Sequence, residues 1–303
     1  MSSVTLAESA KLTQDELLVG VIENVITVNR MFEVVPFLPI EGNSLAYNRE
    51  NVLGDVQVAG VGSSITAKNP ATFTQITSSL TTIIGDAEVN GLIQATRSNK
   101  QDQTAIQVAS KAKSCGRKFQ DMLVNGTGVS NQFSGLLSLA QRSAVTGTDG
   151  SNLTFDILDQ MMDLVTDKDG QVDYFTMPAR TIRSYNGLLR ALGGASINEV
   201  VEMPSGAQVP AYRAVPIFRN DWIPTDQTKG ASTGTTTIFA GTFDDGSQLY
   251  GISGLTAQDA AGLVVTDVGE SETKDEHITR VKWYAGLALF NENGLAQATG
   301  IKN

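Results

Sequence analysis

The sequence contains little of what membrane-spanning, disulfide-bonded or metal-dependent proteins require. Its 303 residues include one cysteine, Cys115, and one histidine, His277. A single cysteine excludes an internal disulfide and fits a reducing compartment, and a single histidine excludes a metal site built on a histidine pair. No apolar run reaches the roughly 18 residues of a membrane-spanning helix. Residues 1–5 lack the basic start and apolar core of a signal peptide, so we expect no signal peptide and no membrane association.

Positive charge is also scarce. The chain has 22 basic and 32 acidic residues, and its formal net charge is −10. An acidic chain is poorly suited to wrapping nucleic acid, which requires clustered Lys and Arg. It could still line a container for DNA, because confinement does not require attraction. Aromatic residues make up only 6% of the chain, whereas glycines number 29, a balance that indicates frequent turns and long extended segments.

Motifs that could carry chemistry are incomplete. Residues 110–113 and 271–274 match the nucleophile pattern S-x-x-K, but its companion motifs are absent. Residues 126–128 are only a fragment of a nucleotide-binding glycine motif, and residues 165–176 lack two carboxylates of a calcium loop. Cys115 lies in the apolar half of a predicted helix, which is typical of a small buried hydrophobe. We therefore predict no catalytic residue, no metal and no cofactor.

One stretch, residues 101–139, organises the chain. Its apolar or small residues recur at steps of three or four, which predicts a helix over residues 101–125 with one buried face. About 24 residues at ~1.5 Å each give a rod of roughly 36 Å, long for a globular protein. We expect Asn125 and Gly126 to supply a left-handed C-cap. The predicted buried face comprises Ile106, Ala109, Ala112, Gly116, Phe119 and Leu123, and the residues mostly off it are Lys111, Lys113, Arg117, Lys118 and Gln120.

A long helix that ends in Leu123 and Asn125-Gly126-Thr127-Gly128, followed by Phe133 and Gly135-Leu136, resembles the spine helix and following loop of tailed-phage major capsid proteins. These proteins have the Hong Kong 97 shell fold. The resemblance implies an α+β fold, and the rest of the chain follows the family order. The implied parts are an N-terminal arm and helix (1–29), a peripheral domain (30–150) with an extension loop (50–77) and spine helix (101–125), an axial domain (151–259), and return strands of the peripheral domain (260–303).

The segment 50–77 is rich in Val and Thr, low in charge and interrupted by Gly54, Gly60 and Gly62. An isolated hairpin of this kind buries little of itself. It is either a flexible surface loop or, as the resemblance implies, an extension loop laid across a neighbouring subunit. Some shells of the family cross-link through a Lys in this loop, a position that Lys68 could fill. Because Glu276 and Trp283 stand where the partner Asn and Glu would be, the resemblance implies no self-cross-linking.

The function implied by the resemblance is that of a major capsid protein of a bacteriophage virion, a structural protein without enzymatic activity. Copies would self-assemble into pentamers and hexamers of an icosahedral shell that encloses double-stranded DNA without binding it specifically. Expected partners are a portal, a separate scaffolding protein and decoration proteins, and assembly would occur in the host bacterial cytoplasm. Two alternatives remain open: an encapsulin-type nanocompartment shell that holds cargo enzymes, and a monomeric hydrolase or binding protein.

Gly116 lies inside the predicted helix, where glycine costs about 1 kcal/mol relative to Ala. It either packs closely against a neighbouring element or marks a bend point, because spine helices of the family are bent in immature shells and straighten on maturation. If Gly116 is a bend point, Gly116→Ala should slow or block expansion, because Ala narrows the backbone conformations available there. Small-angle X-ray scattering of shells before and after expansion measures this, and a variant that expands at the normal rate would reject the bend hypothesis.

Overall fold

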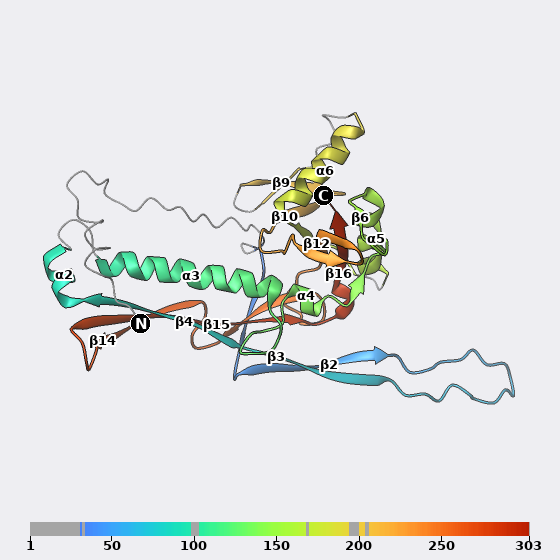
Figure 1. Cartoon of the computed structure of the whole chain (residues 1–303). Coiled ribbons are helices and arrows are strands. Elements are labelled where there is room, and N and C mark those ends of the chain that lie inside the picture. Colours follow the sequence, from blue (N-terminus) through green and yellow to red (C-terminus); the bar gives the residue numbers. More distant parts are fainter. Residues whose placement is uncertain are drawn as a thin grey trace.

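The computed structural model describes residues 31, 34–97, 103–167, 170–193, 200–203 and 206–302. The arm and helix expected over residues 1–29 lie outside these ranges. Within them, one long helix lies along a five-stranded sheet, a nine-stranded sheet carries two shorter helices, and a two-stranded hairpin projects from the body (Figure 1). The chain therefore has the predicted α+β fold.

The five-stranded sheet is organised around its longest strand, β15 (Glu276–Leu289). β4 (Thr81–Asn90) and β14 (Leu263–Glu270) pair antiparallel with the first part of β15. β13 (Ile252–Ala257) pairs with its last part, and β1 (Phe37–Ile40) extends the sheet in parallel with β13. β15 is therefore the strand that joins all parts of this sheet, and its last residues, up to Leu289, pair with β13.

The helix α3 (Gln103–Asn125) lies along β4 and β15 and follows the short helix α2 (Gly91–Arg97) (Figure 1). Its second half is the buried part, centred on Phe119, whose ring centroid lies 4.5 Å from that of Trp283 and 5.6 Å from that of Phe133. Ala109, predicted to be on the buried face, is exposed. The prediction for Gln120 was also wrong: it is buried because its Oε1 accepts a hydrogen bond of 3.0 Å from Nε1 of Trp222, a partner that helical periodicity cannot reveal.

The nine-stranded sheet packs against α5 (Phe155–Thr166) and α6 (Ala179–Ala191) through a second apolar core that includes Leu158, Met161 and Tyr185. Thr154 caps α5, since its Oγ1 accepts a hydrogen bond from Ile157 N. Short α4 (Leu136–Leu139) and η2 (Glu292–Gly294) lie in connections. The strands are β5 (Arg142–Ser143), β16 (Leu295–Lys302), β12 (Ser232–Gly241), β7 (Tyr174–Met177), β10 (Val215–Arg219), β9 (Gln208–Tyr212) and β8 (Val200–Glu202), with β11 (Gln227–Lys229) on β12 and β6 (Ser151–Asn152) on β16.

The domain boundary predicted at residue 259 does not separate the two large sheets. β13, before that residue, belongs to the five-stranded sheet, and β16, after it, pairs with β12 in the nine-stranded sheet. The physical reason is the turn at η2, through which the chain leaves the end of β15 and enters the other sheet. Sheet membership therefore does not follow the ranges 151–259 and 260–303, and the domain division drawn from the sequence remains a proposal.

The turn after α3 depends on glycine for a different reason from the one predicted. Gly126 does not have a positive φ; Gly128 does, at 74°. A Cβ on Gly126 would collide with the carbonyl oxygen of Phe133 and lie 2.5 Å from that of Met122. Gly126 N donates to Met122 O, and Gly135 N donates to Gly126 O, each at 2.9 Å. Gly126 is therefore required by the close approach of two backbone segments and not by a left-handed cap.

Gly126→Ala should destabilise the unassembled subunit by about 1–3 kcal/mol, because rigid backbone atoms would have to move to admit the methyl group. Thermal or urea unfolding of the subunit measures the loss. Gly116→Ala is the matched control: apart from the flanking residues and the helix's own backbone, no atom of the described chain lies within 4 Å of the position that its methyl group would take. Helix propensity should therefore stabilise this variant by up to about 1 kcal/mol. Equal effects of the two changes would contradict this explanation of Gly126.

Candidate assembly surface

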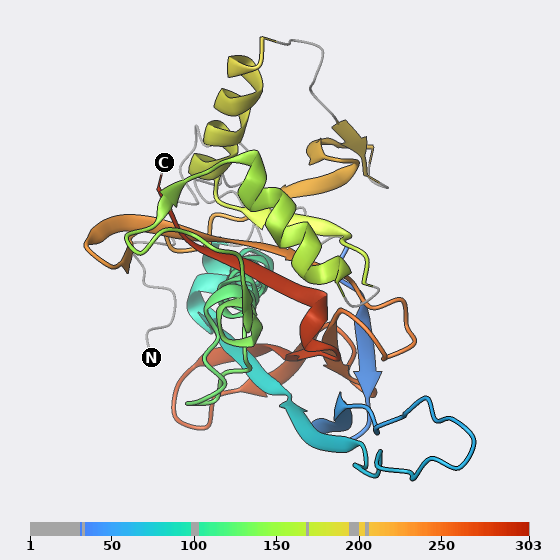
Figure 2. The same cartoon turned by 90° about the vertical axis from the view of Figure 1, so that its right-hand side faces the viewer.

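A projecting hairpin is the candidate assembly surface of the described chain. β2 (Ser44–Val52) pairs antiparallel with β3 (Thr72–Ser79), and in both views the hairpin leaves the body on the side away from α6 (Figures 1 and 2). The ribbon stays paired beyond the strands: Asp55 N donates to Asn69 O at 3.1 Å, and Oε1 of Gln57 accepts from Thr66 N at 2.6 Å. These bonds hold residues 53–71 as a continuation of the hairpin.

Apolar side chains cover this hairpin without any partner in the described chain to bury them. Val58 and Val61 are fully exposed, at 106% and 111% of their reference areas. Single exposed apolar residues are ordinary, but several of them on one projecting element indicate a surface that another molecule covers. We call this group the hairpin patch; its members are Val52, Leu53, Val56, Val58, Val61, Ile65 and Phe73.

The predicted extension-loop residues Gly54, Gly60, Gly62 and Lys68 all lie exposed in this hairpin. Gly62 has φ +84°, a conformation that favours glycine, and Gly60 O accepts from Ser63 N at 3.1 Å in the turn at the tip. Their sequence spacing therefore corresponds to the turn of the ribbon. Their contacts with other subunits remain a prediction.

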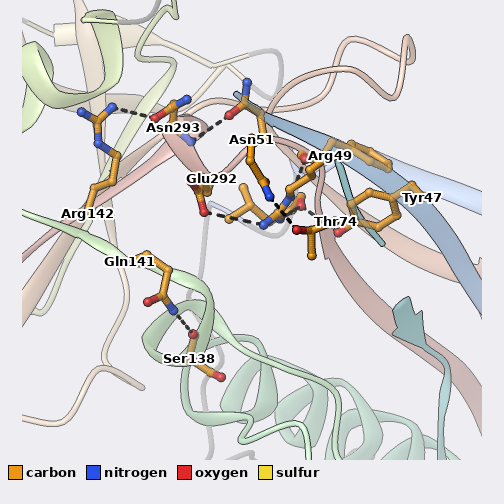
Figure 3. A network of polar contacts seen from close by, with 12 residues as sticks. Tyr47, Arg49, Asn51, Thr74, Ser138, Gln141, Arg142, Glu292 and Asn293 are labelled. Atoms are coloured by element: carbon orange, nitrogen blue, oxygen red, sulfur yellow. Dashed lines mark hydrogen bonds and ion pairs between the residues drawn. The ribbon is translucent and has the colours of Figure 1, made fainter. Parts of the chain in front are cut away.

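Arg49 joins the base of the hairpin to the body, a feature that the sequence did not reveal. Its Nε donates to Phe290 O at 2.8 Å, a terminal nitrogen donates to Leu289 O, and its guanidinium reaches toward Glu292 at 4.0 Å (Figure 3). The hydroxyl of Tyr47 donates to the same Leu289 carbonyl at 2.8 Å. These partners lie about 240 residues apart in the sequence, so no local pattern could have identified them.

The predicted spine residues, in contrast to those of the hairpin, lie in or beside the core. Phe119 and Leu123 are fully buried, and Nδ2 of Asn125 donates to Asp121 Oδ1 at 2.9 Å and to Trp222 O at 3.0 Å. Asn125 thus ties the end of α3 to the loop at Trp222. The environment of Gly116 excludes close packing within the described chain, because a Cβ there would meet open space. The bend hypothesis for Gly116 remains untested.

Four other residues discussed from the sequence lie in the core or along the sheet strands. Trp283 is buried against Phe119, and the Glu276 side chain is almost fully buried, with Lys274 at 3.7 Å. Burial raises the pKa of the Cys115 thiol, which fits a packing role. His277 is partly exposed and pairs with Asp267 at 2.9 Å.

The described residues contain no group of three or more His, Cys, Asp and Glu side chains placed to hold a metal ion. No helix among them combines the length and apolar character needed to cross a membrane. A hollow of about 300 Å³ beside α5 is lined by residues such as Val145, Gln160 and Asp163, without a cysteine or histidine.

An α+β body with a projecting apolar hairpin defines a subunit of a larger assembly, and the comparisons with known proteins agree. Residues 53–226 match the family of the SU10 major capsid protein. The match covers more than half of the chain, which therefore belongs to this family and is a phage shell protein. The prediction of a tailed-phage major capsid protein is confirmed.

Solved structures show the same fold. The holo-SrpI encapsulin complex from Synechococcus elongatus PCC 7942 matches with a TM-score of 0.74 at 18% identity, covering 99% of this chain and 97% of that one. The capsid of Myoviridae Phage XM1 matches at 0.63 and 14%, covering 99% and 100%. The capsid of a native GTA particle matches at 0.65 and 12%, with both chains fully covered. No curated protein matches the sequence.

Proposed function

We propose that copies of this chain assemble as pentamers and hexamers into an icosahedral shell that encloses phage double-stranded DNA. The observation that carries the proposal is the hairpin patch. Fully burying one Val, Leu, Ile or Phe side chain contributes about 1.5–3 kcal/mol. The patch could therefore contribute on the order of 10 kcal/mol per copy, comparable with the roughly 4–15 kcal/mol cost of association.

A contact made through the projecting hairpin is compatible with rings. A projecting hairpin that covers a different surface on its neighbour makes a head-to-tail contact, and such contacts close into rings when the rotation between copies allows it. Pentamers and hexamers are rings of this type. Repetition of the same contact around each ring lets one hairpin per copy stabilise the whole assembly.

The acidic composition supports enclosure of DNA without specific binding. With a net charge of −10, the chain has little capacity for the clustered basic contacts that nucleic-acid binding needs. We further propose a purely structural role, without catalysis or cofactor. The family resemblance supports a portal, a separate scaffolding protein and decoration proteins as partners, and assembly in the host bacterial cytoplasm.

The second candidate function is an encapsulin-type nanocompartment that holds cargo enzymes, favoured by the similarity to the SrpI encapsulin. Electron microscopy of purified particles combined with nuclease digestion distinguishes the two. DNA-filled heads or empty proheads support the phage shell, whereas small cages loaded with protein support the nanocompartment.

Replacing residues 53–71 with a two-residue Asn-Gly turn should abolish closed shells and leave the subunit folded. The strands β2 and β3 would remain joined, and most of the removed side chains are exposed, so the body loses little. Analytical ultracentrifugation and negative-stain microscopy measure assembly, and thermal unfolding measures the body. Closed shells at wild-type yield would contradict the proposal.

Two double substitutions test whether the position of the exposed apolar residues in the hairpin matters, rather than surface polarity in general. Val58→Ser with Val61→Ser should weaken assembly, whereas Val145→Ser with Leu249→Ser, which changes exposed apolar residues outside the hairpin, should not. Sedimentation of the two double variants at equal concentration measures the difference. Equal losses from both pairs would show that the hairpin patch has no special part in assembly.

A further inference from the structure

Arg49 is the outermost residue of β2 that reaches the body. Along β2 the side chains of Leu45, Tyr47 and Arg49 are half-buried, alternating with exposed neighbours, as expected for a strand with one covered face. Beyond Arg49, every residue from 50 to 66 is exposed. Arg49 is therefore the last residue along β2 that is covered by the body.

The contacts of Arg49 suit a rigid attachment. Its side chain is only 18% exposed and binds two successive backbone carbonyls, those of Leu289 and Phe290. A guanidinium offers several N–H donors in one fixed plane, so two such bonds define an orientation as well as a distance. The guanidinium also lies 5.8 Å from the centre of the Tyr47 ring (Figure 3). The Tyr47 ring itself packs edge-on against Phe290 at 5.3 Å.

The carbonyls that Arg49 binds belong to a turn that is held from its other side. This turn carries the chain from β15 through η2 into β16, and thus from one large sheet to the other. Oδ1 of Asn293 accepts from Arg142 at 2.9 Å (Figure 3). Oδ1 of Asn291 accepts from Asn293 N at 2.9 Å. Arg142 also donates to Leu164 O of α5. The hairpin is therefore attached to a point that both sheets fix.

Small rotations at this point have large effects at the tip. The 11 residues from Glu50 to Gly60 span at most about 36 Å when extended. A rotation of about 10° at Arg49 would then move the tip by roughly 6 Å, more than the ~4 Å over which apolar atoms remain in contact. A hairpin patch displaced by that amount would miss the surface it has to cover.

We propose that Arg49 is the positioning residue of the hairpin: its bonds to the carbonyls of Leu289 and Phe290 set the hairpin direction and thereby the geometry of subunit contacts. The second half of this inference rests on the proposed assembly of copies through the hairpin. The first half concerns the free subunit alone and can be tested without assembly.

The first experiment measures hairpin direction in the dilute, full-length subunit. Spin labels are placed at Val56→Cys in the hairpin and Asp163→Cys on α5, with Cys115→Ala so that only these two positions react, and the distance distribution is recorded by double electron–electron resonance. Arg49→Ala should broaden the distribution and shift its maximum by several ångströms, since about 10° over the ~23 Å from Arg49 to Val56 corresponds to ~4 Å. Arg49→Lys, which keeps the charge but loses the planar fork, should lie between Ala and wild type.

Arg213→Ala is the matched control. Arg213 likewise lies over a tyrosine ring, Tyr212 at 5.7 Å, and pairs with a carboxylate, Asp159 at 3.3 Å, but it is remote from the hairpin in sequence and contacts. It should leave the distribution unchanged. If Arg49→Ala gives the same distribution as wild type and Arg213→Ala, Arg49 does not position the hairpin.

The second experiment follows shell formation by the unlabelled variants with electron microscopy. Arg49→Ala should give few closed shells or shells of irregular size, and Arg213→Ala should give normal ones. Normal shells from an Arg49→Ala subunit whose label distances have changed would overturn the link between hairpin direction and assembly. Failure of the wild-type chain to form shells would contradict the proposed function, and the label distances would still decide the role of Arg49.

Discussion

The contact between Phe119 and Trp283 is the interaction on which the rest of the structure depends. Both side chains are buried, their ring centroids lie 4.5 Å apart, and the rings of Phe37 and Phe133 join them at 5.6–5.9 Å. Losing one such aromatic from a core typically costs about 3–5 kcal/mol. The cluster fixes α3 on β15, and β15 ends at the turn that holds Arg49. Packing at the spine helix thus sets the base from which the hairpin projects.

The body and the hairpin of the chain differ in how their apolar side chains can be buried. The body buries its apolar residues in the spine and α5–α6 cores and in a small cluster at the hairpin base, so it folds by its own packing. The hairpin beyond Arg49 keeps its cross-strand bonds but leaves its apolar side chains exposed, and no other part of the described chain buries them. A protein that belongs to a capsid family is expected to show this division, because its interfaces must form after folding and in large numbers.

Local features of the sequence predicted more than its long-range contacts. Periodicity located α3, and the low-charge, Val- and Thr-rich, glycine-interrupted segment indicated the hairpin. Gln120, the role of Gly126 and the exchange of β13 and β16 between sheets were missed. Each depends on a partner far away in the sequence or on the opposite backbone segment: Trp222 for Gln120, and Phe133 for Gly126. Arg49 could not be found for the same reason, since an arginine in an exposed strand carries no signal of its distant carbonyl partners.

The central claim is that residues 53–71 become buried only when copies assemble. A cryo-electron microscopy reconstruction of the assembled particle tests it most directly. The account predicts closed shells in which this segment lies against a neighbouring copy, with Val58 and Val61 removed from solvent. Shells in which residues 53–71 project freely into solvent, with the copies joined through other surfaces, would contradict it.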